Sequence, residues 1–481
     1  MISDITKAYK DYAIYLPSLQ ESYADFCFNE KLLDKDGNNK RALQPLNFDL
    51  DKLNFLDNKA VWHHNATLYS CGQYSGSTIP NRNIVAERDR SYTTIVGDSG
   101  GYQLGTNALR RKETKQFFGN YVDKPTLFAK RWKQCGEVER VVGFLNAYCD
   151  YSMTLDMVMW GSLEFNKNST SPIRNLSVKQ LIDLTVDNLK YIDTQRNIGN
   201  EHKTKWLNVT QCIGNVNGVN SGLEWYNAVK DFDFEGWAFG GGTAFHLHQL
   251  LRWARKIIDD GKFEGREWIH ILMKSPPYSS ILYTVIQNKI NELCGTDLRI
   301  SYDSSSASQI VGKQYSLFDY NELTSDLKTW SNSSTKIDAD FDKDILTNNR
   351  VNNLPNWHPL STLINHNDFF YDNGELHKSI WYDSTTYELA KNYNMYVQHR
   401  RAIDACDLYF DTELKNHSRI PSMFLQLTDY CNEYLTCENP NTLEAKHTKL
   451  LREYDSKFAS LKMLLPKTDE GWNAVFAEFQ F

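Results

Sequence analysis

The sequence predicts an α/β protein built as a (β/α)8 TIM barrel, with insertions and an additional, mainly helical C-terminal region. The first observation is the alternation of short apolar runs with helical stretches between residues 61 and 315, which is typical of a parallel sheet. The second is that several of these runs end in Gly, Asp, Gln or Lys. A TIM barrel carries its chemistry at the carboxyl ends of its strands. A doubly wound open sheet is the alternative, but its Gly-rich phosphate turn would follow the first strand, and the triplet Gly240–Gly242 lies elsewhere.

The expected elements follow one another in a simple order. The strands are expected at 66–70, 93–96, 151–155, 205–210, 235–239, 268–273 and 298–302. Helices are expected behind an N-cap at Ser177, over 221–229, over 244–258 behind Thr243, and over 281–293 with Gly295 near the C-cap.

Three regions are expected along the chain. Residues 1–60 form an N-terminal lead-in, and residues 61–315 form the TIM-barrel catalytic core. Residues 316–481 form a C-terminal region that completes the barrel, binds nucleic acid, or does both. From residue 316 on, Ser, Asn and Asp become dense, as in a linker or long loop, and helices are expected over 385–412 and 440–465.

The composition indicates a soluble globular protein. The chain has 481 residues, of which 41% are hydrophobic and 23% charged, and no apolar run is long enough to span a membrane. Its nine cysteines include no Cys-x-x-Cys pair, so neither a disulfide framework nor a zinc site is indicated, and reduced thiols favour a cytoplasmic location. The net charge of -7 argues against a non-specific nucleic-acid coat but allows a local basic groove.

Three carboxylates stand at predicted strand ends: Asp98, Asp156 and Asp303. Each alone could be a helix N-cap or a loop residue. Together with Gln211 and the Gly240–Gly242 backbone, they match the hydrogen-bonding groups of a purine-like base. One carboxylate could attack C1′ of the sugar, and a second could move the proton to and from the bases.

Five blocks, in order, resemble the tRNA-guanine transglycosylase family over residues 90–310. DSGGYQ begins at Asp98, and CDYSMTLD ends at Asp156. NVTQCIG contains Gln211, and GWAFGGG ends at Gly242. The last block comprises Leu272-Met273 followed by DSSSA from Asp303.

The resemblance implies a role for each matching residue. Asp303 would be the nucleophile on C1′, and Asp98 the general acid/base. The base would be bound by Ser99, Tyr102, Asp156, Gln211, Gly240, Gly241 and Met273.

The cysteines of the family's zinc site have no counterpart here, because Cys406, Cys431 and Cys437 are too widely spaced. No metal and no cofactor are therefore expected. The chain most resembles the branch that acts on DNA in phages and in bacterial modification clusters. The resemblance implies exchange of guanine in DNA for a 7-deazaguanine base of the preQ0 type, 7-cyano-7-deazaguanine or a relative.

DNA as a partner requires the target guanine to leave the base stack and enter the barrel mouth. Basic residues at the rim would contact the nucleic-acid backbone, and binding would weaken with salt. The candidates are Arg82, Arg88, Arg110, Arg111, Lys112, Arg400 and Arg401.

Three other functions remain open at this point. The enzyme could act on tRNA instead of DNA. It could be a non-catalytic, nucleic-acid-binding subunit, although such a subunit would not need all three carboxylates. It could also be a glycoside hydrolase on a similar barrel, which needs a close carboxylate pair but no glycine platform for a flat base.

Overall fold

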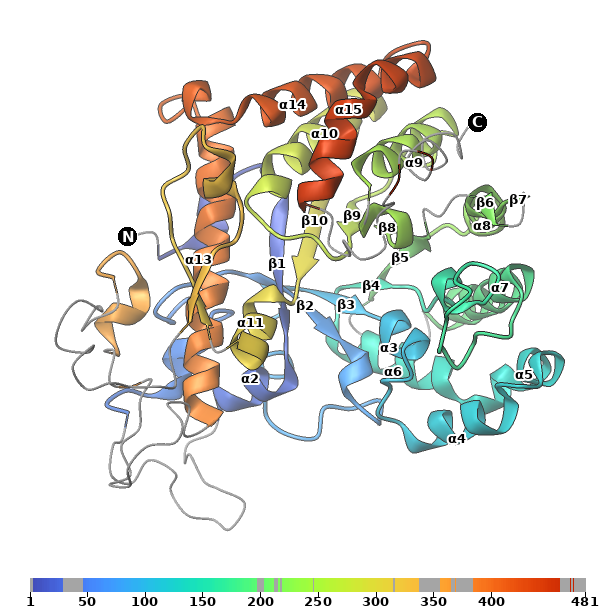
Figure 1. Ribbon diagram of the computed structural model, residues 1–481. Coiled ribbons are helices and arrows are strands. Elements are labelled where there is room, and N and C mark those ends of the chain that lie inside the picture. Colours follow the sequence, from blue (N-terminus) through green and yellow to red (C-terminus); the bar gives the residue numbers. More distant parts are fainter. Residues whose placement is uncertain are drawn as a thin grey trace.

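The fold is a closed barrel of eight parallel strands, as predicted (Figure 1). A computed structural model describes residues 3–28, 46–196, 203–211, 215–216, 219–244, 246–314, 316–336, 355–364, 368, 384–458, 468 and 470. The strand order around the barrel is β1-β10-β9-β8-β5-β4-β3-β2. These strands are β1 (Ile14–Leu19), β2 (Ala66–Ser70), β3 (Thr94–Asp98), β4 (Tyr151–Met153), β5 (Lys205–Thr210), β8 (Gly236–Phe239), β9 (Trp268–Ile271) and β10 (Arg299–Ser304).

Helices surround the barrel and extend it at one end. Two short antiparallel pairs, β6 (Asn215–Val216) with β7 (Val219–Asn220) and β11 (Ser316–Phe318) with β12 (Ser334–Lys336), lie outside the barrel sheet. The helices are α1 (Ile5–Tyr9), α2 (Glu21–Phe26), α3 (Gly101–Gly105), α4 (Lys112–Tyr121), α5 (Pro125–Arg131), α6 (Glu137–Tyr148), α7 (Val178–Gln195), α8 (Ser221–Val229), α9 (Leu247–Asp259), α10 (Tyr278–Cys294), α11 (Ser306–Gln314), α13 (Ser384–Phe410), α14 (Ser422–Tyr434) and α15 (Pro440–Phe458).

The strand predictions are confirmed within a few residues, but the first barrel strand was missed. β1 pairs in parallel with β10 on one side and β2 on the other, so the predicted lead-in over 1–60 in fact contains a barrel strand. Its sequence, IYLPSL, carries Pro17, and a proline normally argues against a central strand. Here the Pro17 carbonyl accepts a hydrogen bond from the Thr67 hydroxyl, at 2.6 Å, within the barrel.

Helix ends follow the predicted signals in two of three cases. Ser177 caps α7 through a capping box with Gln180, and α10 ends at Gly295, whose φ is +62°. Helix α9 begins later than predicted, with His246 rather than Thr243 at its N-cap. A 3₁₀ turn over Gly241–Ala244 precedes it.

The C-terminal region covers the barrel from outside. All eight barrel strands end by Ser304, so this region adds helices and no barrel strand among the described residues. The long helix α13 runs beside α10, α11 and β1, and α14 and α15 lie across the end of the barrel near α9 and α10 (Figure 1). The predicted helix over 440–465 ends at Phe458, and its last residues, like the linker residues 337–354, lie outside the described residues. No described helix combines the length and apolar character needed to cross a bilayer.

The barrel interior requires glycine at Gly236. A Cβ atom there would lie 2.0 Å from the Trp268 carbonyl oxygen of the neighbouring strand. We expect Gly236→Ala to lower the free energy of unfolding by about 3 kcal/mol, because backbone in a closed sheet cannot move away. Gly119→Ala in α4 is the control, since a Cβ there meets nothing within 4 Å and alanine favours helix by up to about 1 kcal/mol. Urea denaturation of both variants measures the difference, and equal stabilities would contradict this account of the barrel.

Candidate active site

A cavity of about 900 Å³ opens at the carboxyl ends of the barrel strands. Its wall combines residues that follow all eight barrel strands with residues of the C-terminal region, which is the position expected for a TIM-barrel active site. Every predicted catalytic and base-binding residue lines it: Asp98, Ser99, Tyr102, Asp156, Gln211, Gly240, Gly241, Met273 and Asp303.

The turn after β3 presents Asp98 to the cavity. Gly100 has a φ of +83°, a left-handed conformation that suits glycine, and its amide donates to Oδ1 of Asp98 at 3.0 Å. Burial raises the pKa of Asp98, and the nearby carboxylate of Asp303 adds to this effect. A carboxyl group with a raised pKa keeps its proton to higher pH than an ordinary aspartate, which suits a general acid.

Asp156 and Gln211 form a buried pair beside the turn that carries Asp98. The side-chain amide of Gln211 donates to Oδ2 of Asp156, and both residues are buried. Burial raises the pKa of Asp156 to about 7. A Cβ on Gly101 would lie 2.6 Å from Oδ1 of Asp156, so the second glycine of the motif leaves room for this carboxylate.

Two glycines of the turn after β8, Gly240 and Gly241, line the cavity. The amide of Gly240 donates to the Thr210 carbonyl at 2.9 Å and so continues the barrel ladder. The prediction that it holds the base is therefore wrong for the Gly240 amide. Gly241, with a φ of +57°, also lines the cavity.

One carboxylate oxygen of Asp303, near the end of β10, is held by neighbouring donors. Its Oδ1 accepts from the Met273 amide at 3.0 Å and lies 3.3 Å from Nε2 of His270. Met273 has a φ of +62°, and this uncommon backbone conformation directs its amide at the carboxylate. Among the described residues both contacts are made to Oδ1, so Oδ2 is the oxygen that can meet a ligand.

His270 is a site residue that the sequence analysis missed. It is fully buried on β9, and its Nδ1 lies 2.9 Å from the Ser301 hydroxyl. The Trp268 indole donates to the same hydroxyl at 2.7 Å, and the Ile269 carbonyl lies 3.4 Å from it as a second acceptor. The other ring nitrogen, Nε2, faces the Asp303 carboxylate, which only accepts when ionised, so this contact favours the tautomer in which Nε2–H donates to Asp303 and Nδ1 accepts from Ser301. The sequence feature that could have identified His270 is a histidine two residues after a tryptophan within an apolar strand.

The remaining predicted base contacts differ in exposure. The Ser99 hydroxyl is buried and donates to the Thr154 carbonyl at 3.1 Å. The Tyr102 side chain is 54% exposed, and its ring centroid lies 5.8 Å from that of Trp160. Trp160, which the sequence did not single out, thus pairs with Tyr102 at the cavity mouth, where aromatic faces can stack on a base.

Two of the predicted backbone-binding arginines are wrong. Arg88 is buried, pairs with Asp150 at 2.8 Å and donates to the Thr93 carbonyl. Arg401 is 1% exposed and donates to three backbone carbonyls, those of Asp319, Thr329 and Ser331. Both guanidinium groups stabilise the fold from inside and cannot reach a nucleic acid.

The other predicted basic residues divide by exposure. Arg400 is mostly buried beside Asp404, and Arg111 donates to the Cys135 carbonyl. Arg82, Arg110 and Lys112 are exposed, with Arg110 paired to Glu21. Two lysines that the sequence did not suggest, Lys313 and Lys457, line the cavity itself.

Comparison of the chain with models of known protein families and with curated proteins finds no match.

Proposed function

We propose that this chain is a DNA-guanine transglycosylase, which replaces guanine in DNA by a 7-deazaguanine base through a covalent aspartyl-sugar intermediate. One observation carries the proposal. Three carboxylates, a glutamine amide and a glycine turn, far apart in sequence, line one cavity at the mouth of a closed barrel. The resemblance to the tRNA-guanine transglycosylase family assigns roles in base exchange to these same groups.

Asp303 and Asp98 each act twice, once when guanine leaves and once when the new base enters. Oδ2 of Asp303 attacks C1′ of the deoxyribose, and the bond from C1′ to the guanine nitrogen breaks while Asp98 gives its proton to the leaving base. The entering base then returns a proton to Asp98. Its ring nitrogen attacks C1′, the ester bond breaks, and Asp303 regains its carboxylate.

Recognition of the base falls to Asp156 and its neighbours. The ionised carboxylate of Asp156 accepts from the ring N–H and amino groups of guanine, and the Gln211 and Gly241 amides donate to its carbonyl oxygen. The aromatic pair Tyr102 and Trp160 at the mouth supports the flipped nucleotide by stacking.

His270 serves as a positioning residue for the nucleophile. We expect His270→Phe to lower kcat on the order of tenfold to 100-fold with little change in KM for DNA, because Asp303 loses one of the two donors on Oδ1. His270→Gln, which keeps a donor, should recover part of the rate. Single-turnover base exchange measures both variants, and equal loss in the two would contradict a hydrogen-bonding role.

The proposed function is tested by offering duplex DNA, single-stranded DNA and tRNA with labelled 7-cyano-7-deazaguanine. Mass spectrometry of the released nucleosides identifies the product. Label in deoxyribonucleosides supports the proposal. Label in tRNA alone would assign the enzyme to tRNA, and absence of label in all three would overturn base exchange.

A further inference from the structure

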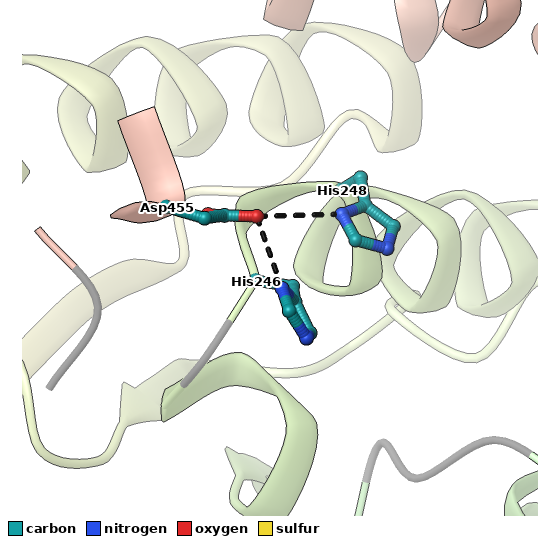
Figure 2. Close-up of side chains that lie close together, drawn as sticks. All are labelled: His246, His248 and Asp455. Carbon is teal, nitrogen blue, oxygen red and sulfur yellow. Dashed lines mark hydrogen bonds and ion pairs between the residues drawn. The ribbon is translucent and has the colours of Figure 1, made fainter. Parts of the chain in front are cut away.

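Two histidines and one aspartate meet in a buried cluster outside the active-site cavity. His246 is the N-cap of α9, His248 lies in its first turn, and Asp455 lies near the end of α15. Their exposed fractions are 5%, 0% and 1%. Figure 2 shows both imidazole rings directed at the same Asp455 oxygen, from elements about two hundred residues apart in sequence.

The spacing of the three side chains matches metal coordination. Nδ1 of His246 lies 3.0 Å and Nδ1 of His248 lies 3.7 Å from Oδ2 of Asp455. Ligands about 2.1 Å from a tetrahedral zinc ion lie about 3.4 Å from one another. The candidate ligand atoms of all three residues lie within 4.8 Å of each other, so an ion fits between them after small side-chain rotations.

We propose that His246, His248 and Asp455 bind one divalent transition-metal ion of the Zn²⁺ type. Two imidazole nitrogens and one carboxylate oxygen are a donor set that zinc accepts, with water as the fourth ligand. To bind the ion, His246 adopts the tautomer with its proton on Nε2, which frees the Nδ1 lone pair. The Leu247 amide, at 3.1 Å from Oδ1 of Asp455, holds the carboxylate so that Oδ2 faces the rings.

Two buried cations lie near this site. Lys274 interacts electrostatically with Asp455 and Arg252 with His248, so both oppose a bound cation. Removal of one of these charges in Lys274→Met should therefore tighten metal binding. The ligands also differ from the cysteines that the resemblance to the transglycosylases would require.

The position of the ion gives it a structural role. The His246 amide donates to the Gly242 carbonyl at 2.9 Å, within the glycine turn beside the cavity. Three residues after Asp455, Phe458 lines the same cavity. An ion bound here would join α9 and the glycine turn to α15 and hold two parts of the cavity wall together.

Metal analysis of the full chain tests the proposal. After treatment with a chelator, the protein is dialysed against Zn²⁺ or Co²⁺, and bound metal is measured by atomic emission. We expect one ion per chain, a rise of the melting temperature with Zn²⁺, and a visible Co²⁺ spectrum of tetrahedral intensity. His248→Asn and Asp455→Asn should each lower the affinity on the order of 100-fold.

His447→Asn, on α15 but outside the cluster, is the matched control and should bind as the wild type does. Equal metal binding by His248→Asn and wild type would overturn the site, as would a wild-type chain that binds no ion. The Co²⁺ spectrum of the wild-type chain tests the proposal even if a variant fails to fold. A sulfur-to-cobalt charge-transfer band would place the ion on cysteine and contradict the proposal, and its absence with a tetrahedral spectrum would support it.

Discussion

Asp303→Asn is expected to reduce base exchange by at least about 10⁴-fold while the protein stays folded, because the amide cannot form the ester to C1′. The substitution keeps the size of the side chain and the Oδ1 acceptor for the Met273 amide, so the cavity wall should be preserved. Incorporation of labelled 7-deazaguanine into DNA, followed by mass spectrometry, measures the loss.

Asp297→Asn provides the matched control for this prediction. Asp297 is exposed and lies just before the first residue of β10, whereas Asp303 lies near the last. Its substitution removes one carboxylate at the end of the strand that is far from the cavity. Full activity of Asp297→Asn with loss in Asp303→Asn locates the chemistry at the carboxyl end of the strand. Substantial exchange by Asp303→Asn would reject Asp303 as the nucleophile.

Denaturing electrophoresis adds a test of the intermediate. With DNA and no entering base, the wild type should accumulate a covalent protein–DNA adduct that a later addition of base removes. Asp303→Asn should form none. Asp98→Asn lacks the proton donor for the leaving guanine, so it should form the adduct more slowly than the wild type.

Asp156→Asn is expected to change activity and stability in opposite directions. Exchange should fall on the order of 100-fold or more, because an amide cannot accept from two donors of guanine as a carboxylate can. Stability at alkaline pH should rise, because the wild-type chain has to ionise a buried carboxyl group with a pKa of about 7.

The pH window follows from the direction of the shift. The folded-state pKa of about 7 lies above the unfolded value of 3.8, so folding favours the protonated acid. Stability is therefore lost as pH rises from about 4 to about 7, by up to roughly 4 kcal/mol at pH 8. Asparagine carries no charge and escapes this cost, so the melting temperature of Asp156→Asn should exceed that of the wild type at pH 8 and approach it at pH 4.

The exposed Asp183 on α7 is the control for this effect. It pairs with Lys179 at 3.2 Å in solvent, and Asp183→Asn should shift the melting temperature little at either pH. A difference between Asp156→Asn and wild type that does not change with pH would show that the carboxyl group is not the source. A buried carboxyl group that lowers stability but is required for activity is typical of a functional site. Its replacement should therefore raise the stability and lower the activity together.

Sequence patterns alone predicted the barrel and most of the polar residues that line its cavity. Strands β2 and β5 end at their predicted residues. A buried strand appears in the sequence as a short apolar run, and the turn residues that follow mark its end. Asp98, Asp156, Gln211 and Asp303 could be grouped without coordinates, since parallel strands in a closed sheet bring their carboxyl ends to one mouth.

Tertiary structure decided what depends on contacts between distant segments. Strand β1 was not predicted, because its Pro17 argues against a central strand. Only the pairing of β1 with β10 and β2 shows that a proline is tolerated there. Arg88 and Arg401 read as surface cations, yet packing places their charges inside the fold. The contact of His270 with Asp303 and the meeting of His246 and His248 with Asp455 join strands and helices that share no local pattern. Local sequence determines elements and their ends, whereas the environment of each charge is set only when those elements pack.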